Sequence, residues 1–245
     1  MTALWLLSLA IKDSSIVDIF WGLGFVILAF VYNIFSEDGY ALRKTLLTAL
    51  VTIWGVRLAI YIAWRNLGKG EDYRYRNWRE QAGESWWWKS YLRVFILQGI
   101  IMLIVSVPLL AAQHSGSPDS LTILDGLAVL IWAIGFAFEA GGDLQMALFK
   151  AKPDNKGKVL DSGFWRYTRH PNYFGDAVQW WAYFLVALAA GGWWSIFSPI
   201  LMTFFLVRVS GVAMLEKTLV ESKPKYRDYI KRTSAFVPMP PRQKA

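Results

Sequence analysis

The chain has 245 residues, of which 55% are hydrophobic and 16% aromatic, and its mean hydropathy is +0.32. A chain of this length cannot cover so much apolar surface in water, so a soluble fold is excluded and an integral membrane protein is predicted. The chain lacks cysteine and has only two histidines, which excludes disulfides and argues against a metal site. The net charge of +8 does not indicate a nucleic-acid partner, because the basic residues gather in loops beside apolar segments.

The apolar segments predict an all-α, polytopic bundle of six to seven transmembrane helices. Residues 1–11 are apolar, but at about 1.5 Å per residue they cover only half of a roughly 30 Å hydrocarbon core. Six longer segments can cross the membrane, at about 14–35, 42–64, 91–112, 121–149, 172–190 and 193–216. The chain has no internal repeat, low-complexity tract or long linker, so we expect one domain over residues 1–245.

Lysine and arginine are concentrated on one side of this predicted bundle. The loop 65–93 carries seven of them, the loop 150–169 carries six and the chain after Glu216 carries eight, which is 21 of the 26 in the chain. The connections on the opposite side carry none. The positive-inside rule therefore predicts that the loops around 65–93 and 150–170 and the C-terminal tail are cytoplasmic.

Several ionisable residues lie inside the apolar segments, where a charge that faces lipid is costly. They are Asp18, Arg57, Glu139, Asp143, Asp176, Arg208 and Glu216. Glu139 and Asp143 are four residues apart, and Lys150 follows seven residues later on the same helix face. Salt bridges between helices are one interpretation. A ligand site is the other, because this face leads toward the cytoplasmic loop before the fifth segment.

That loop and the start of the fifth segment, residues 161–176, carry the densest polar motif of the chain. Its polar side chains include Arg166, Arg169, His170, Asn172, Tyr173 and Asp176. Pro171 favours the first turn of a new helix, where backbone N–H groups lack partners, and the flanking arginines make such a helix start an anion site. The motif therefore indicates a phosphate-bearing cofactor at the membrane surface, or else a basic loop that fixes the orientation of the protein.

Aromatic residues alternate with cations over Tyr73–Arg76. The cations Arg74 and Arg76 could pair with the phosphates of a nucleotide while the rings stack on it, or the segment could lie at the lipid headgroups. In the tail, Tyr226 and Tyr229 could face the same cofactor or the membrane interface. No glycine motif of the Walker or dinucleotide type is present, so a Rossmann domain is excluded.

These motifs together resemble the steroid 5-alpha reductase-like membrane family, in a bacterial branch described as a domain of unknown function. The resemblance runs over nearly the whole chain, and its anchors are Val17–Gly22, Glu71–Tyr75, Gly141–Gln145, Trp165–Asp176 and Val209–Lys217. Isoprenylcysteine carboxyl methyltransferases and their bacterial relatives carry a similar Arg-His-Pro-x-Tyr element for S-adenosylmethionine.

The resemblance implies an enzyme that binds NADPH from the cytoplasmic side and reduces an activated carbon–carbon double bond of a sterol, isoprenoid or other enone lipid. It places Asp143 and Lys150 as the acid and base that hold the cofactor. It also implies that Asp18 and Tyr61 are the substrate-polarising pair. The candidate cofactor residues are Arg74, Arg76, Glu139, Asp143, Lys150, Arg166, Arg169, His170, Asn172, Tyr173, Asp176, Arg208, Glu216, Tyr226 and Tyr229.

In the expected reaction the nicotinamide supplies hydride, and Tyr61, hydrogen-bonded to Asp18, stabilises the enolate oxygen that develops on the substrate. The first alternative is an S-adenosylmethionine-dependent methyltransferase. Those enzymes usually have paired acids near the start of the tail, whereas Lys217 follows Glu216 here. The second alternative is a non-catalytic lipid-binding protein. Membrane lipids and an apolar substrate are the expected partners, and the membrane is the inner one if the chain is bacterial.

Overall fold

The computed structural model describes residues 1–66, 68–209, 216 and 226–242. Within these residues every regular element is helical, and the only β-type contact is an isolated bridge between Thr168 and Ser234. The all-α class is therefore confirmed. The chain falls into two compact units, Met1–Ser120 and Leu121–Ala245, which we call unit 1 and unit 2.

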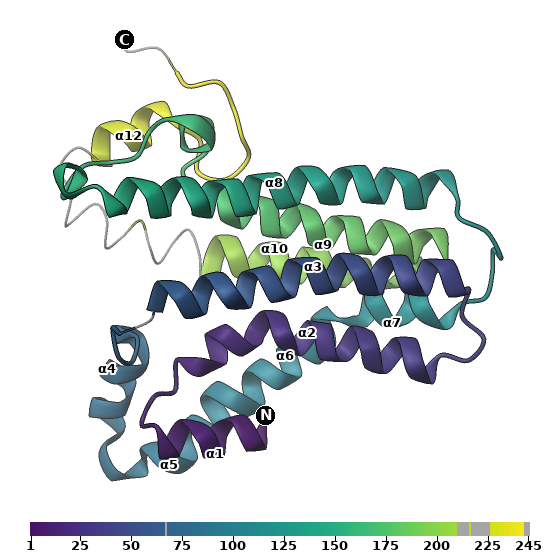
Figure 1. Ribbon diagram of the computed structural model, residues 1–245, viewed down its shortest axis with the longest axis horizontal. Helices are drawn as coiled ribbons and strands as arrows, with labels where there is room; N and C mark the ends of the chain where they lie inside the picture. Colours follow the sequence, from purple (N-terminus) through teal and green to yellow (C-terminus); the bar gives the residue numbers. More distant parts are fainter. Residues whose placement is uncertain (67, 210–215, 217–225, 243–245) are drawn as a thin grey trace. The chain divides into compact units, whose positions relative to one another are not determined.

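Unit 1 begins with a short helix and continues with two long ones. Its elements are α1 (Thr2–Ala10), α2 (Ile16–Phe35), α3 (Ala41–Asn66), α4 (Tyr73–Ala82), the 3₁₀ turn η1 (Gly83–Ser85), α5 (Trp86–Ser90), the π-helical turn η2 (Tyr91–Ile96), α6 (Leu97–Val105) and α7 (Val107–His114). The helix α1 confirms that the first apolar stretch is a separate element, too short to span a membrane. In Figure 1, α2 and α3 lie side by side.

Unit 2 is built on two long antiparallel helices. Its elements are α8 (Ile123–Ala151), η3 (Pro153–Asn155), η4 (Gly163–Arg166), α9 (Pro171–Ala189), η5 (Trp193–Ile196), α10 (Phe197–Phe204), η6 (Phe205–Val209) and α12 (Tyr226–Arg232). Figure 1 shows α8 and α9 packed along each other. The helix α9 begins at Pro171, as the sequence predicts, because proline fits the first helical position, where its missing N–H costs nothing.

Four helical stretches among the described residues are long and apolar enough to cross a membrane, so the chain is an integral membrane protein. They are Ile16–Phe35, Ala41–Asn66, Tyr73–Val105 and Ile123–Ala151. The last two expected spans are also helical where they are described, as α9 and as the shorter apolar helix Trp193–Val209. Six spans therefore stay a prediction.

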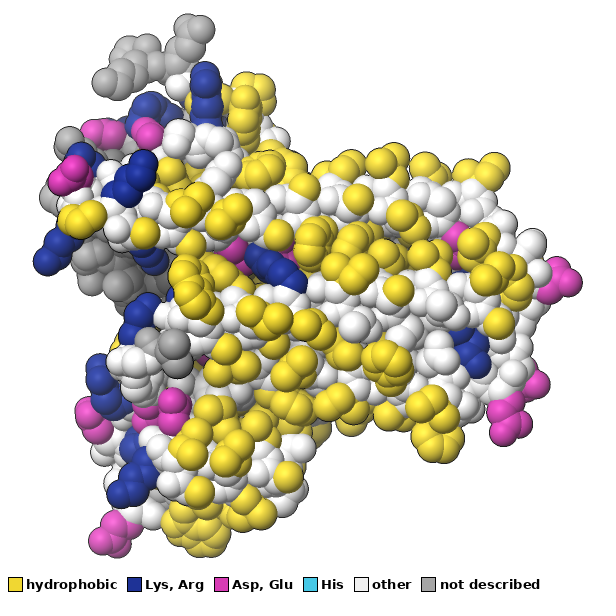
Figure 2. Space-filling model, viewed as in Figure 1, with side chains coloured by type: hydrophobic (Ala, Val, Ile, Leu, Met, Phe, Trp, Pro, Cys, Tyr) yellow, Lys and Arg dark blue, Asp and Glu magenta, His cyan; other side chains and the backbone are white. Residues whose placement is uncertain are grey.

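The surface of the helices agrees with a lipid environment. Large apolar side chains are exposed along them, for example Ile34, which is 68% exposed, and Ile123, which is 84% exposed. Figure 2 shows hydrophobic side chains over the visible lengths of the helices, with most charged side chains gathered near helix ends. Such a surface would be unfavourable in water, whereas hydrocarbon chains cover it without cost.

Glycines allow the long helices of each unit to approach closely. In unit 1, a Cβ atom added to Gly22 would lie 2.4 Å from the carbonyl oxygen of Gly55. In unit 2, a Cβ atom added to Gly175 would lie 2.3 Å from the carbonyl oxygen of Gly135 and 2.4 Å from the backbone nitrogen of Glu139. Small residues at such crossings let helix backbones pack against each other in a membrane.

We expect Gly175→Ala to destabilise unit 2, because the new methyl group would press on backbone atoms that cannot move independently. The free energy of unfolding should fall by about 1–3 kcal/mol, the usual cost of overpacking. Gly126→Ala on α8 is the matched control, because its Cβ atom would meet no atom within 4 Å. Denaturant unfolding in detergent micelles measures both, and equal stability of the two variants would contradict the close crossing.

Candidate functional site

A cluster of charged residues joins the start of α2 to α4 in unit 1. The Tyr75 hydroxyl donates to Oδ1 of Asp18 at 2.6 Å, and Nη2 of Arg74 donates to Oδ2 of the same carboxylate at 2.7 Å. Nε of Arg74 also donates to Asp72 at 2.9 Å, and Asp72 caps α4 by accepting from the backbone N–H of Arg74. We call Asp18, Asp72, Arg74 and Tyr75 the Asp18 cluster.

A second ion pair holds the turn between α1 and α2 to the same region. Nε and Nη2 of Arg79 donate to the two oxygens of Glu71 at 2.9 and 2.7 Å, and the backbone N–H of Ser14 donates to Glu71 at 2.7 Å. Burial by itself would raise the pKa of Glu71, but the hydrogen bonds from Arg79 and Ser14 outweigh it and lower the pKa below its usual value. This carboxylate therefore stays charged and fixes the turn.

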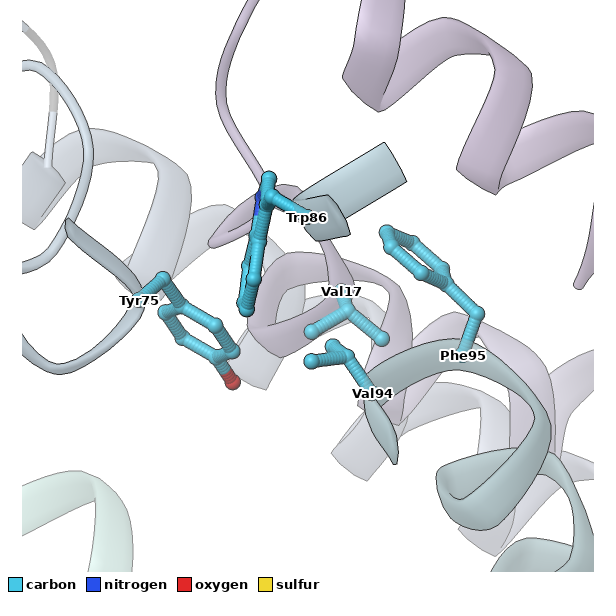
Figure 3. Packing of buried hydrophobic residues seen from close by; sticks show 5 residues of the cluster. All are labelled: Val17, Tyr75, Trp86, Val94 and Phe95. Carbon is cyan, nitrogen blue, oxygen red and sulfur yellow. The ribbon is translucent and has the colours of Figure 1, made fainter. Parts of the chain in front are cut away.

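An apolar cluster lies beside these polar contacts. Tyr75 packs with Val17, Trp86, Val94 and Phe95, all buried (Figure 3). The ring of Tyr75 therefore sits in an apolar environment while its hydroxyl reaches Asp18. Gln98 of α6 also donates toward this hydroxyl, at 3.4 Å.

The pairing of Tyr61 with Asp18 stays a prediction. The side-chain donors on Asp18 are Arg74 and Tyr75, whereas the Tyr61 ring lies against the guanidinium groups of Arg57 and Arg65, at 5.4 and 5.8 Å. The sequence interpretation treated Arg74 and Tyr75 as part of a loop. Asp72 starts a helix there, which turns both side chains toward α2, while Arg76 remains exposed.

We expect Tyr75→Phe to destabilise unit 1, because the partly buried carboxylate of Asp18 loses a donor. The free energy of unfolding should fall by about 1–3 kcal/mol, the cost of leaving a buried acceptor short of a partner. Tyr73→Phe is the control, because Tyr73 lies on the same helix and is 48% exposed. Chemical unfolding in micelles compares the two, and a Tyr75→Phe variant as stable as Tyr73→Phe would contradict this role.

Three polar pairs connect α8 and α9 in unit 2. Nδ2 of Asn172 donates to Oδ1 of Asp143 at 3.2 Å, Nε2 of Gln179 donates to Oε2 of Glu139 at 2.6 Å, and Nε1 of Trp132 donates to the Tyr183 hydroxyl at 3.0 Å. We call these the α8–α9 polar pairs. They follow one another from the start of α9 into the apolar part of both helices, and Asp143 and Glu139 are buried.

The loop before α9 is anchored on α8. Nε1 of Trp165 donates to the carbonyl of Gly142 at 3.0 Å, and Oε1 of Gln145 accepts from the backbone N–H of Phe164 at 3.0 Å. These bonds place the Arg-His-Pro-Asn motif beside Asp143. Two cations of this end, Lys150 and Arg166, are exposed.

Arg169 binds protein oxygens from the tail and from Glu216. Its Nε donates to Glu216 at 2.7 Å, and its Nη1 donates to the backbone carbonyls of Ile230, at 3.1 Å, and Thr233. Nε2 of His170 lies 3.2 Å from the same Glu216 oxygen.

The tail follows the loop before α9 in an extended path. The backbone N–H of Arg169 donates to the carbonyl of Ser234 at 2.9 Å, and the N–H of Met239 donates to the carbonyl of Tyr167 at 2.9 Å. The hydroxyl of Tyr229, on α12, donates to the carbonyl of Trp165. Arg169 and Tyr229 therefore tie the tail to the motif, a role for which the sequence gave no signal because their partners are mostly backbone carbonyls.

The other predicted residues differ in burial. Asp176 is 8% exposed and Tyr226 is 4% exposed, while Arg208 is exposed at the end of η6. Tyr173 stacks on His170 with ring centroids 5.7 Å apart. Unit 2 thus brings Asp143, Asn172 and Glu139 onto one helix interface, and Arg74 and Arg76 belong to unit 1.

The sequence interpretation missed Gln179, Tyr183 and Trp132. A signal for Gln179 was present, because it follows Asn172 by seven residues and Asp176 by three, which is the spacing of one helix face. Tyr183 continues that spacing by four residues. Their side chains carry no charge, so a pattern of ionisable residues does not single them out, although buried polar groups in an apolar helix also need partners.

We expect Arg169→Ala to loosen the tail, because Glu216 and two backbone carbonyls lose a charged donor. The docking of α12 should weaken by about 1.5–3 kcal/mol, the range for hydrogen bonds to charged groups. Arg227→Ala is the control, since Arg227 is exposed on α12 itself. Limited proteolysis and hydrogen exchange of residues 226–242 measure the effect, and unchanged protection in Arg169→Ala would contradict it.

Comparison with known proteins gives a family without an assigned activity. A family described as a protein of unknown function, DUF1295, matches residues 4–233. The chain is also 25% identical over 268 residues to an uncharacterized protein of Schizosaccharomyces pombe, covering 96% of this chain and 75% of that relative. No solved structure matches the chain.

Proposed function

This chain belongs to the DUF1295 family of proteins of unknown function, and we propose that it is a membrane enzyme that uses NADPH to reduce an activated carbon–carbon double bond in a lipid. We further propose that the family is part of the steroid 5-alpha reductase-like group, on the motifs quoted above. The reaction consumes the double bond, one hydride and one proton, and yields the saturated lipid and NADP⁺.

The observation that carries this proposal is the series of α8–α9 polar pairs. Asp143 and Asn172 come from a charged helix face and from the Arg-His-Pro-Asn motif, and they meet at 3.2 Å. The pair of Glu139 and Gln179 continues the series into the apolar part of the helices. Two helices that only pack in a membrane can do so with apolar and small side chains, so buried acids and amides at this interface favour a polar ligand.

The residues of unit 2 fit a pyridine nucleotide. Lys150 and Arg166 are exposed cations at the loop end, where phosphates can form charge-assisted hydrogen bonds and stay hydrated. Asp143 and Asn172 offer an acceptor and an amide to ribose or amide groups. In this proposal Arg169 does not contact the cofactor. Its guanidinium binds Glu216 and the tail and thereby positions His170 and Asn172.

The bound cofactor would supply the hydride to the β carbon of the enone. The protein would orient both reactants, exclude water and stabilise the negative charge that develops on the carbonyl oxygen of the substrate. Asp18 of unit 1 remains a candidate acid for a substrate carbonyl, and we add Tyr75 to Tyr61 as a candidate partner hydroxyl. Tyr75 is buried with its ring held in the apolar cluster, and its hydroxyl would have to turn its one proton from Asp18 to a substrate oxygen.

We also propose that the loops around 65–93 and 150–170 and the tail face the cytoplasm. The basic residues are concentrated in these segments, and the opposite connections lack them. This orientation gives the cofactor site of unit 2 access to the soluble NADPH pool.

We expect purified protein to be stabilised against heat by NADPH and not by S-adenosylmethionine. Asn172→Ala should lower the affinity for NADPH by roughly tenfold, the effect of one hydrogen bond of about 1.4 kcal/mol. Asn77→Ala, an exposed asparagine on α4, is the control and should bind as the wild type does.

Thermal shift and titration calorimetry in micelles measure these affinities. Stabilisation by S-adenosylmethionine alone would replace the reductase proposal with the methyltransferase. A folded protein that responds to neither ligand would leave lipid binding as the function. NADPH oxidation with an enone lipid then tests the reaction itself.

A further inference from the structure

The amide of Gln179 has only one possible orientation. Its Nε2 lies 2.6 Å from Oε2 of Glu139 and 3.3 Å from the backbone carbonyl oxygen of Gly175. The Gly175 oxygen can only accept a hydrogen bond, and the Glu139 oxygen accepts from the same N–H₂ group. Reversing the amide would therefore place its oxygen against two oxygens, so the N–H₂ end must face them.

This orientation leaves Oε1 of Gln179 without a hydrogen-bond partner among the residues that the structure describes. The side chain is fully buried, and its Cγ packs at the crossing with Gly135 of α8. A buried acceptor without a partner costs about 1–3 kcal/mol, so native proteins rarely keep one without a reason. The missing partner must be a hydrogen-bond donor, because a carbonyl oxygen can only accept.

The position of Gln179 in the helix restricts the donor to a neutral group. Gln179 lies seven residues beyond Asn172 on the same face of α9, which is about 10 Å along the helix and into its apolar part. Phosphate groups would not bind at the depth of Gln179, because a charge in that apolar environment is costly. For a cofactor whose phosphates stay at the loop with Lys150 and Arg166, the end that reaches Gln179 is the uncharged one.

We propose that Oε1 of Gln179 accepts a hydrogen bond from the primary carboxamide of the reduced nicotinamide ring. The inference rests on the proposed use of NADPH and adds the residue that recognises its reactive end. The reduced ring is neutral and largely apolar, and its carboxamide supplies the N–H donor that Oε1 lacks. Glu139 is then a positioning residue, because its carboxylate holds the N–H₂ end of Gln179 and turns Oε1 toward the ligand.

The test compares three ligands by titration calorimetry with the full-length protein in micelles. They are NADPH, its reduced analogue with a carboxylic acid in place of the carboxamide, and 2′-phospho-ADP-ribose, which lacks the nicotinamide. The wild type should bind NADPH at least tenfold more tightly than the acid analogue, because a carboxylate repels Oε1. Gln179→Met should abolish this preference and leave the affinity for 2′-phospho-ADP-ribose unchanged.

Two further variants make the comparison specific. Trp181→Phe removes a different hydrogen-bonding group of α9, whose indole N–H donates to Thr203 at 3.2 Å, and it should keep the wild-type preference. Gln179→Asn keeps the amide but draws its oxygen back by one methylene, so the preference should shrink. It also serves as the informative variant if Gln179→Met does not fold, as judged by its melting curve.

The outcomes separate the two proposals. A wild type that binds neither NADPH nor 2′-phospho-ADP-ribose overturns the cofactor assignment and this inference with it. A wild type that binds both, with the same preference for NADPH over the acid analogue in folded Gln179→Met or Gln179→Asn, overturns the role of Gln179 alone. In that case a buried water is the partner of Oε1.

Discussion

The close crossing of α8 and α9 is the constraint on which the candidate cofactor site depends. Because Gly135 and Gly175 have no side chains, the two backbones approach until a Cβ atom would lie 2.3 Å from a carbonyl oxygen. At that separation short polar side chains can bridge the helices, and Asp143 meets Asn172 while Glu139 meets Gln179. Wider spacing would leave these groups facing lipid without partners, which the membrane penalises. The polar pairs between α8 and α9 therefore depend on the close packing that the two glycines allow.

Several arginines of this protein hold its structure together by binding oxygens of the chain. Arg169, Arg79 and Arg74 each bind carboxylates of the chain, and Arg169 also binds backbone carbonyls. These guanidinium groups hold loops and the tail in place. Lys150 and Arg166 are exposed, whereas Arg169 in the same region is buried. Cations of this motif therefore differ in what surrounds each one.

Carboxylates and arginines also pair in unit 1, near the start of α2. Asp18 lies in the first turn of α2 and receives two donors from α4, and Glu71 receives donors from Arg79 and from the turn before α2. The negative charges of Asp18 and Glu71 neutralise the positive charges of Arg74 and Arg79, so the basic segment has no excess charge at these contacts. The Tyr75 hydroxyl is the one neutral member of the Asp18 cluster, which is why we add it as a candidate partner of the substrate oxygen.

The sequence alone determined the class of the fold, because long apolar segments in a membrane can only satisfy their backbone as helices. It also determined the start of α9, since Pro171 forces a helix boundary, and it picked out Asp143 and Asn172 by their position on apolar helices. Only the tertiary structure decided the partners. Arg74 and Tyr75 donate to Asp18, and Arg169 binds Glu216 and the tail, because partners far apart in the chain meet through packing that no local spacing records. For the same reason only the packed α8 and α9 reveal that the carbonyl of Gln179 faces away from both of its neighbours.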